Sequence, residues 1–212
     1  MLDHNFYITT PRLAITYPDP KSEAHIAFSL ELYKDYTTTD ANGNVKHTIP
    51  DRAAAIAMME TRAAQIETTG YGRYYVSVLP PTSSPEEDEA ERVQKSTLVG
   101  MVSLNLRNAD APPLPDIGFN LLPSTRGKGY ATEAVEGLTK WYEKEKGVTE
   151  LLGYCDDDNL ASIKVLRRAG FELLGDRVIA SLMNAGNVSQ EHQGKLLVWT
   201  RGLKKDPKEY GL

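Results

Sequence analysis

The chain has 212 residues, of which 41% are hydrophobic and 25% charged, a composition typical of one globular domain with a sizeable core. A formal net charge of −5 argues against sequence-independent binding to nucleic acid, which requires a basic surface. The single cysteine, Cys155, excludes an intramolecular disulfide and a zinc site built from several cysteines. Because we find neither a secretory signal nor an apolar stretch of membrane-spanning length, we expect a cytoplasmic protein without a membrane partner.

The negative charge is concentrated in one segment, residues 80–96. This segment contains five acidic and two basic residues together with three prolines, so it carries −3 of the total charge. Such a composition predicts a solvated loop inserted between two strands. A loop that docks a partner or is phosphorylated is the alternative. We therefore expect one domain over residues 1–212 with an acidic loop insertion at about 80–96.

The first half of the chain predicts a strand, two helices and the start of a sheet. Pro11 interrupts residues 8–16, which is tolerated only in an edge strand. Apolar residues at helical spacing predict a helix over 22–33, and the polar run 37–44 predicts a loop. A second helix is expected from Pro50 to about residue 67, closed by Gly70.

The second half predicts a strand meander followed by alternating helices and strands. We expect strands over 71–79, 97–107, 116–122, 149–155, 171–179 and 195–201, helices over 129–146 and 159–169, and a polar turn at 184–194. An antiparallel meander followed by strand–helix–strand–helix–strand indicates an α+β fold with a mixed sheet.

The most informative segment is the glycine-containing loop between the strand ending at Leu122 and the helix beginning near Gly129. Glycines let backbone N–H groups approach a ligand, and the positive end of the helix dipole favours an anion such as phosphate. Arg126 and Lys128 add positive charge. The alternative is a tight turn with solvated basic residues. The spacing fits neither a P-loop nor a dinucleotide fingerprint, whose third glycine would stand at Thr132.

Three motifs carry a family resemblance. Arg126-x-x-Gly129-x-Ala131 resembles the R/Q-x-x-G-x-G/A acyl-CoA pyrophosphate loop of the GNAT superfamily of N-acetyltransferases. The run from Asn159 through Ser162 to Gly170-Phe171 resembles the N-x-x-S…G-F helix of its RimJ/RimL-type branch. Thr10-Pro-Arg-Leu13 is similar to the opening T-x-R-L strand of that branch, and the three motifs occur in the right order.

The resemblance implies a GNAT-like, mostly antiparallel sheet of about seven strands, splayed into a V-shaped acyl-CoA cleft and flanked by about four helices. The backbone of Leu121 and Leu122 would pair with pantetheine, Asn159 would bond the pantetheine arm, and Ser162 would lie near the thiol. The remaining cofactor-binding residues that it implies form the pyrophosphate loop: Arg126, Gly127, Lys128, Gly129, Tyr130, Ala131 and Thr132. Without the resemblance, Asn159 is an N-cap and Ser162 an exposed helix residue; for Asn159 both roles are compatible.

Amine acetylation requires a neutral amine, a polarised thioester carbonyl and a proton for the departing thiolate. Asp116 stands where the branch often has an acidic residue and is the candidate general base, directly or through water. Its alternative is a polar residue at the start of a strand. Many superfamily members have a tyrosine acid four residues before the G-F glycine, but this chain has Leu166 there, so Ser162 or a water would protonate the thiolate.

The acceptor site would be formed by residues 32–49 and 179–196, the segments that give the fold its specificity. Tyr33, Asp35 and Tyr36 are the candidate wall residues, with ordinary surface at a helix end as the alternative. An acyl-cysteine mechanism at Cys155 has no local signature to support it, and the histidines lack metal-ligand spacing, so we expect no metal.

The sequence thus predicts transfer of an acetyl group from acetyl-CoA to a primary amine, by direct attack in a ternary complex. The acceptor would be a protein N-terminus or a small-molecule amine, and the protein a monomer or homodimer that binds no nucleic acid. The rival hypothesis is a catalytically inert acyl-CoA-binding module that senses or scaffolds.

Overall fold

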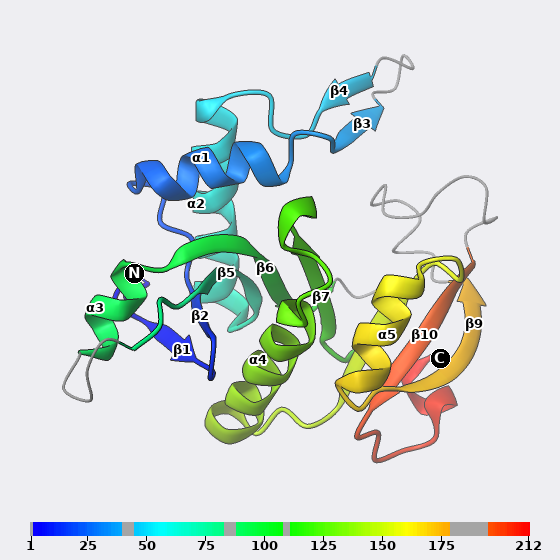
Figure 1. Ribbon diagram of the computed structural model, residues 1–212. Coiled ribbons are helices and arrows are strands. Elements are labelled where there is room, and N and C mark those ends of the chain that lie inside the picture. The colour runs from blue at the N-terminus through cyan, green and yellow to red at the C-terminus, as the bar shows by residue number, and fades with distance from the viewer. Residues whose placement is uncertain (1, 40–44, 83–87, 108–110, 179–194) are drawn as a thin grey trace.

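The computed structural model of the chain describes residues 2–39, 45–82, 88–107, 111–178 and 195–212 (Figure 1). Eight strands form one sheet in the order β1-β2-β5-β6-β7-β8-β10-β9, and β3 and β4 form a separate hairpin. Neighbouring strands of the large sheet are antiparallel except β7 and β8, which are parallel. The fold is therefore the mixed α+β sheet that the sequence predicts.

The elements have the following bounds. The strands are β1 (Tyr7–Thr9), β2 (Leu13–Thr16), β3 (Thr37–Thr39), β4 (Val45–His47), β5 (Gly72–Val78), β6 (Thr97–Asn105), β7 (Asp116–Leu121), β8 (Leu151–Cys155), β9 (Glu172–Val178) and β10 (Lys195–Arg201). The α-helices are α1 (Glu23–Leu32), α2 (Arg52–Thr69), α3 (Glu89–Gln94), α4 (Tyr130–Lys146) and α5 (Leu160–Arg168). Two 3-10 turns, η1 (Pro123–Thr125) and η3 (Pro207–Tyr210), complete the described chain.

Three expectations from the sequence need correction. Residues 8–16 form two strands, β1 and β2, because the chain reverses around Pro11 and the two strands pair with each other. The expected loop at 37–44 contributes β3, which pairs with β4. The acidic segment contains the helix α3, whose N-terminus is capped by the Asp88 side chain. The large sheet consequently has eight strands where about seven were expected, and five α-helices are described where about four were expected.

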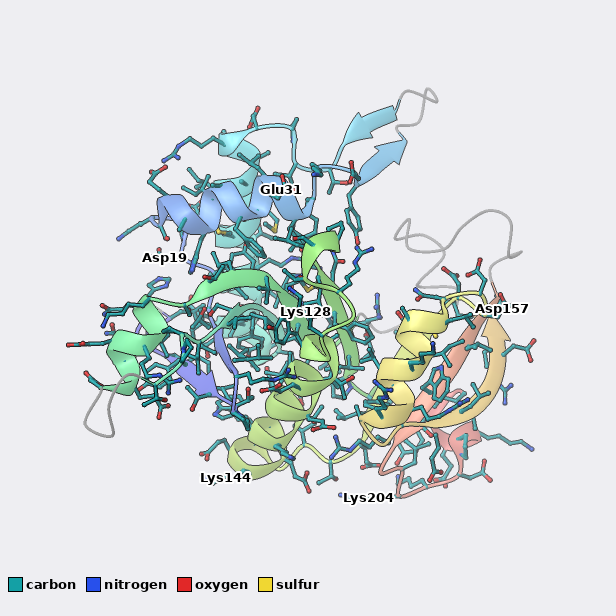
Figure 2. The ribbon with its side chains drawn as sticks, viewed as in Figure 1. Asp19, Glu31, Lys128, Lys144, Asp157 and Lys204 are labelled. Carbon is teal, nitrogen blue, oxygen red and sulfur yellow. The ribbon has the colours of Figure 1, made fainter. Side chains whose placement is uncertain are left out.

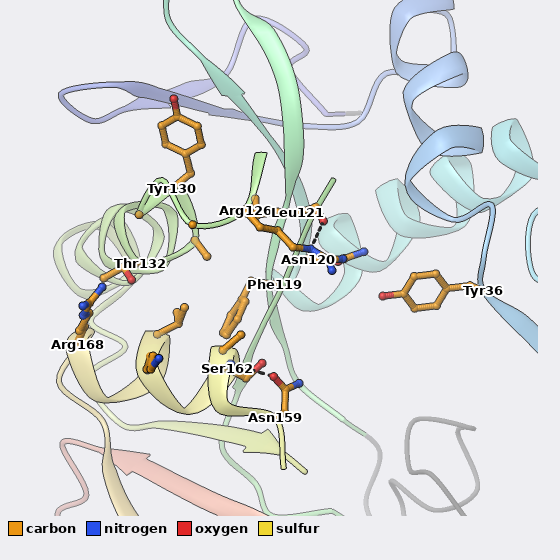
Figure 3. Close-up of a pocket in the computed structure, with 16 residues that line it drawn as sticks. Tyr36, Phe119, Asn120, Leu121, Arg126, Tyr130, Thr132, Asn159, Ser162 and Arg168 are labelled. Carbon is orange, nitrogen blue, oxygen red and sulfur yellow. Dashed lines mark hydrogen bonds between the residues drawn. The ribbon is translucent and has the colours of Figure 1, made fainter. Parts of the chain in front are cut away.

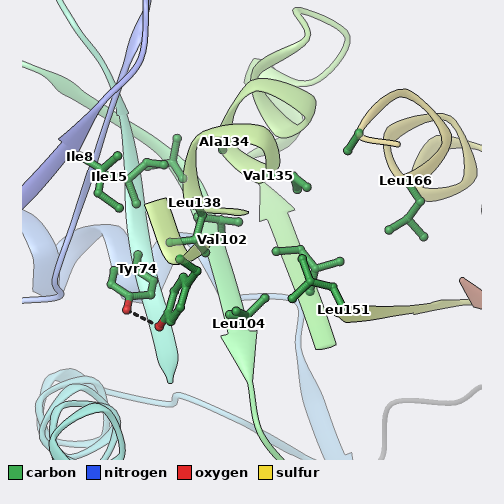
Figure 4. Packing of buried hydrophobic residues seen from close by; sticks show 14 of the residues in the cluster. Ile8, Ile15, Tyr74, Val102, Leu104, Ala134, Val135, Leu138, Leu151 and Leu166 are labelled. Atoms are coloured by element: carbon green, nitrogen blue, oxygen red, sulfur yellow. Dashed lines mark hydrogen bonds between the residues drawn. The ribbon is translucent and has the colours of Figure 1, made fainter. Parts of the chain in front are cut away.

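The two faces of the sheet are covered by different helices. Alternate residues of the central strands pack with α4 and α5, and the others pack with α1 and α2. Figure 4 shows the first of these layers, in which Leu138 of α4 and Leu166 of α5 lie over Val102 and Leu151 of the sheet. In this core the hydroxyl groups of Tyr74 and Tyr142 are hydrogen-bonded at 2.7 Å, which satisfies two buried polar groups.

The parallel strands β7 and β8 are in register for only two residue pairs. Asp116 lies opposite Leu152 and Ile117 opposite Gly153, and no pairing continues beyond them. The remainder of β7 stays paired with β6, from Gly118 to Leu121. The two strands therefore separate and form the V-shaped opening expected from the resemblance. No helix in the described part of the chain is long and apolar enough to cross a lipid bilayer.

Candidate active site

The N-terminus of α4 differs from those of the other four described α-helices. Side chains cap α1, α2, α3 and α5, whereas α4 starts at Gly129, which offers no side-chain cap. The N–H groups of residues 127–132 meet no acceptor in the described part of the chain, and the first helical bond runs from Glu133 to the Gly129 carbonyl. Because these donors and the helix dipole point the same way, the turn has the geometry that suits an anion.

The backbone of the loop adopts left-handed conformations at two glycines. Gly127 has φ +80° and Gly129 φ +82°, values that residues with a side chain rarely adopt. A Cβ atom on Gly129 would also lie 3.4 Å from the Arg12 guanidinium. The two glycines thus let the chain turn sharply from η1 into α4 and leave its N–H groups uncovered.

The ladder between β6 and β7 determines which backbone groups of β7 are available. Leu122 donates its N–H to the Val99 carbonyl at 2.9 Å, so that residue faces β6. Since hydrogen-bonding directions alternate along an antiparallel strand, the backbone of Phe119 and Leu121 faces the opening toward β8. Of the two predicted pantetheine-binding residues, Leu121 faces the opening, where Nε of Arg126 donates to its carbonyl at 3.1 Å, whereas the Leu122 amide is engaged by β6.

A pocket of about 530 Å³ lies at this opening (Figure 3). Its lining comes from β7, the loop before α4, α4 itself, α5 and Tyr36, which follows α1. The lining residues are Tyr36, Phe119, Asn120, Leu121, Arg126, Gly127, Gly129, Tyr130, Ala131, Thr132, Asn159, Ala161, Ser162, Lys164, Val165 and Arg168. The structure thus brings together most of the residues that the sequence assigned to the cofactor.

The described lining has three cationic side chains and no carboxylate. Arg126 comes from the loop, and Lys164 and Arg168 come from α5. The sequence reasoning missed Lys164 and Arg168. Their spacing of four residues places them on one helical face, together with Ala161 and Val165, and that spacing was the available signal. Three cations beside free N–H groups suit the phosphates of a nucleotide.

Asn159 and Ser162 lie together at the start of α5. The Asn159 side chain accepts a hydrogen bond from the Ser162 N–H at 3.0 Å, so Asn159 is the N-cap of α5. Both residues line the pocket, and Figure 3 shows them at its lower wall. The Asn159 amide nitrogen remains available as a donor, which makes the capping and ligand-binding roles compatible.

Arg12 and Glu133 connect the β1–β2 turn to the loop. Glu133 accepts hydrogen bonds from the Thr10 hydroxyl at 2.7 Å, the Arg12 N–H at 2.9 Å and the Arg12 guanidinium at 2.6 Å. The same guanidinium donates to the Lys128 carbonyl at 3.1 Å and lies 5.0 Å from the centre of the Tyr130 ring. Arg12 therefore binds the carbonyl side of the loop, and the N–H groups of the loop remain free of this contact.

Two predicted cofactor residues, Leu122 and Lys128, are outside the described lining. The Lys128 side chain is exposed and its carbonyl is bound by Arg12. In Figure 2, Lys128 marks the turn before α4 and Asp157 the turn before α5, the two turns that border the pocket. Lys128 contributes its backbone to the loop, and its charge adds to the positive potential nearby.

Asp116 lies at the base of the V, in an ion pair with Arg107. The guanidinium donates to both carboxylate oxygens, at 2.7 and 2.8 Å, and Asp116 is 3% exposed. Burial raises the pKa of Asp116, and the hydrogen bonds and charge of Arg107 oppose this rise. Asp116 is outside the described pocket lining and, by strand alternation, faces the α1–α2 side of the sheet.

The three predicted acceptor residues are placed differently. Tyr36 lines the pocket and is 48% exposed, and its hydroxyl points toward Asn120 in Figure 3. Tyr33 is buried beneath it; the two rings are in edge-on contact, with their centres 5.5 Å apart. Asp35 is exposed and outside the described lining. Of the two specificity segments, residues 40–44 and 179–194 lie outside the described residues.

Neither Cys155 nor a metal site contributes to this pocket among the described residues. Cys155 is buried and outside the described lining, and burial raises the pKa of its thiol, which keeps it protonated. Over the described ranges, no three His, Cys, Asp or Glu side chains are grouped so that they could bind a metal ion.

Comparisons with known proteins agree with this geometry. Residues 12–172 match the model of the acetyltransferase (GNAT) domain family. A curated relative, an uncharacterized N-acetyltransferase YjdG of Bacillus subtilis (strain 168), is 37% identical over 68 residues, 32% of this chain. That match spans 40% of the length of the curated relative.

Solved structures share the fold over almost the whole chain. One is an acetyltransferase of Salmonella typhimurium that modifies the N-terminal serine of ribosomal protein L7/L12; the TM-score is 0.65 and the identity 15%, over 94% of this chain and all of the other. Another is the microcin C7 self-immunity acetyltransferase MccE with acetyl-CoA and AMP; the TM-score is 0.62 and the identity 17%, over 92% of this chain and 94% of the other. A RimL acetyltransferase is also among these neighbours. As the motifs around Arg126 and Asn159 predict, the chain belongs to the acetyltransferase (GNAT) domain family.

Proposed function

We propose that this protein is an acetyl-CoA-dependent N-acetyltransferase that transfers the acetyl group directly to a primary amine. The observation that carries the proposal is the uncapped N-terminus of α4, which opens into a cationic pocket beside the edge of β7 that faces away from β6. An acyl-CoA presents both parts that such a pocket accommodates, a pyrophosphate and an arm with amide groups.

Different pocket residues would bind different parts of acetyl-CoA. The N–H groups of the loop and the side chains of Arg126, Lys164 and Arg168 would hold the phosphates. The backbone of Phe119 and Leu121 that faces away from β6 would pair with the amides of the arm, as an added strand pairs with a sheet, and the ligand would compete with Arg126 for the Leu121 carbonyl. This arrangement directs the thioester toward the base of the V.

The chemistry requires one proton to leave the ammonium group before attack and one to reach the thiolate after it. The amine nitrogen then forms a bond to the acetyl carbonyl carbon, the bond from that carbon to sulfur breaks, and the nitrogen releases a second proton, which balances the one that the thiolate takes up. Asp116 is the proposed base, directly or through water; burial raises its pKa, and the bonds and charge of Arg107 oppose the rise. Leu121 would polarise the carbonyl through its N–H, and Ser162 or a water would protonate the thiolate.

The solved neighbours support both classes of acceptor. The Salmonella enzyme modifies a protein N-terminus, and MccE was solved with AMP as well as acetyl-CoA. Either class would approach from the α1–α2 side, where Tyr36 forms the wall of the pocket.

One observation favours the alternative of an inert acyl-CoA-binding module. Leu166 occupies the position at which many superfamily members have a tyrosine acid, and it is 1% exposed within the core. An apolar residue there cannot donate a proton. The module hypothesis predicts coenzyme binding without turnover.

The deciding experiment measures thiol release from acetyl-CoA in the presence of a panel of primary amines. We expect turnover with at least one amine. Ser162→Ala should lower kcat about 100-fold or more if Ser162 supplies the proton, while the Kd for coenzyme A changes little. Ser124→Ala, at an exposed serine of η1 outside the described lining, is the matched control. Stabilisation by acetyl-CoA without thiol release for any amine would favour the inert module.

A further inference from the structure

Two arginines on the α1–α2 side of the sheet have no carboxylate partner among the described residues. Arg62 lies on α2 and its guanidinium contacts Gln65 at 3.1 Å. Arg73 lies on β5 and donates to the Tyr33 hydroxyl, with its guanidinium 5.6 Å from the centre of that ring. Neither forms an ion pair with a carboxylate in the described part of the chain.

The two guanidinium groups are partly buried, so the lack of a carboxylate partner among the described residues indicates that an anion from outside could bind there. Nε of Arg73 is fully buried and has no hydrogen-bond partner among the described residues. Burial and the nearby charge of Arg73 both lower the pKa of Arg62. Buried like charges destabilise each other, and buried polar groups are almost always hydrogen-bonded, so the arrangement is that of a site that receives an anion.

The strand register places the pair beside the reaction centre. Arg73 lies opposite Ser103 of β6, and Ser103 lies opposite Gly118 of β7. Gly118 directly follows Ile117, the last residue of β7 that pairs with β8. Arg73 is thus two strands away from the point where the V opens, about 10 Å at the usual strand spacing.

Two further contacts join the arginines to the pocket. The Tyr33 ring, which lies against Arg73, is in edge contact with the ring of Tyr36, and Tyr36 lines the pocket. Between the two sites the Ser103 side chain covers Gly118, because a Cβ on Gly118 would lie 2.8 Å from its hydroxyl. The contacts through Tyr33 and Tyr36 therefore link the arginines to the pocket.

We propose that Arg73 and Arg62 bind an anionic group of the acceptor, a carboxylate or a phosphate about 10 Å from the amine that is acetylated. The acceptor class is then an amine whose negative charge is separated by a spacer, such as a short peptide or a long-chain amino acid. This inference rests on the proposed function and specifies its substrate. A guanidinium binds either anion through charge-assisted hydrogen bonds.

The test compares matched acceptors in the thiol-release assay. The panel contains glycine, 4-aminobutanoate, 6-aminohexanoate and 8-aminooctanoate, the corresponding amino alcohols, and one aminoalkyl phosphonate of matched length to distinguish the two anions. We expect kcat/KM for the longer amino acids to exceed that of their amino alcohols about 10- to 100-fold, since hydrogen bonds to charged groups are strong. Glycine should show no such advantage because it cannot span the distance.

Variants identify the residues responsible. Arg73→Gln should abolish the preference for anionic acceptors by raising KM, with kcat for the amino alcohols and the Kd for acetyl-CoA unchanged. Arg73→Lys should restore part of the preference. Arg52→Gln is the control. It removes an exposed arginine, paired with Glu23, at the start of α2, the helix that carries Arg62, and it should leave the preference intact. A preference that survives in Arg73→Gln, or equal rates for both acceptor series, would overturn the inference and leave the proposed function standing.

A binding measurement separates this inference from the failure of catalysis. Calorimetry with 6-acetamidohexanoate, the acetylated product, requires no turnover. If no amine releases thiol, the proposed function fails. Binding of this probe that is lost in Arg73→Gln would still support the anion site, whereas no binding to the unaltered protein would overturn it.

Discussion

At the scale of single residues, the ion pair with Arg107 determines how available the Asp116 carboxylate is to a ligand. The carboxylate is buried, which raises its pKa, and each of its oxygens accepts one hydrogen bond from Arg107. A carboxylate oxygen has a second lone pair, so an ammonium group or a water can still be bound. The same pair keeps Asp116 in place at the base of the V.

If Asp116 is the base, its ionisation sets the acid limb of the pH–rate profile. Activity then rises with pH as the carboxyl loses its proton. Arg107→Gln removes the group that opposes the raised pKa, so the limb of kcat/KM should move to higher pH. Arg177→Gln, which removes the same charge from the edge strand β9, should not move it. An unchanged limb in Arg107→Gln would assign the proton to a water chain.

In Glu133, unlike Asp116, hydrogen bonds outweigh burial in setting the pKa. Burial alone would raise its pKa, but hydrogen bonds from Thr10 and Arg12 together lower it below the ordinary value of 4.5. Such a carboxylate stabilises the fold above its ordinary pKa, and the contribution is lost as the pH falls through the lowered value.

Glu133→Gln should therefore lower the free energy of unfolding by about 1.5–3 kcal/mol at pH 7, the range for hydrogen bonds to a charged group. The difference from the unaltered protein should shrink as the pH falls below 4.5. Urea titrations at pH 7, 5 and 3.5 measure this. Glu143→Gln, at an exposed carboxylate of α4 that lies 3.8 Å from Arg201, should change little at any pH. A pH-independent effect of Glu133→Gln would refute the role of its charge.

At the scale of elements, a glycine with positive φ lies near each end of α4, but only the one before its N-terminus lines the pocket. Gly127 precedes the helix with φ +80°, and Gly147 closes it with φ +67°. Neither position has any atom within 4 Å of an added Cβ, so alanine would introduce only backbone strain at both. The pair thus separates the cost of strain from the effect on a ligand.

Gly127→Ala and Gly147→Ala should each destabilise the protein by about 1–2 kcal/mol, the cost of a left-handed residue with a side chain. Only Gly127→Ala should also weaken coenzyme A binding, about tenfold or more, because it displaces N–H donors of the pocket. Thermal unfolding measures the first effect and calorimetry the second. Equal binding by both variants would show that the loop does not hold the coenzyme.

At the scale of the whole molecule, a ligand that binds only the folded chain must stabilise it. Coenzyme A at 100 times its Kd should add about 2.7 kcal/mol, or roughly 5–10 °C in Tm for a chain of this size. Because the side chains of Arg126, Lys164 and Arg168 are exposed, the affinity should fall as salt rises. Pantetheine, which lacks phosphates, should bind more weakly and without salt dependence. Equal stabilisation by both compounds would contradict the phosphate site.

Local signals in the sequence were sufficient for most elements and for the loop. Periodicity and end signals predict α2, α4 and α5 because caps such as Asp51 and Gly70 act within one turn of the helix. The motif around Arg126 and Gly129 likewise lies within a few residues. By contrast, α3 was missed because its six residues sit within a strongly acidic, proline-rich segment, which composition describes as loop.

The sequence by itself thus determined the order of most elements, the α+β class, and the glycine-containing loop before α4, since each depends on neighbouring residues. Only the tertiary structure decided which partners these residues meet. It brought Arg12 to Lys128, Arg107 to Asp116 and Arg73 to Tyr33, and turned Lys164 and Arg168 toward the pocket. These contacts depend on strand register and helix packing, which join residues far apart in the chain and leave no trace in local composition.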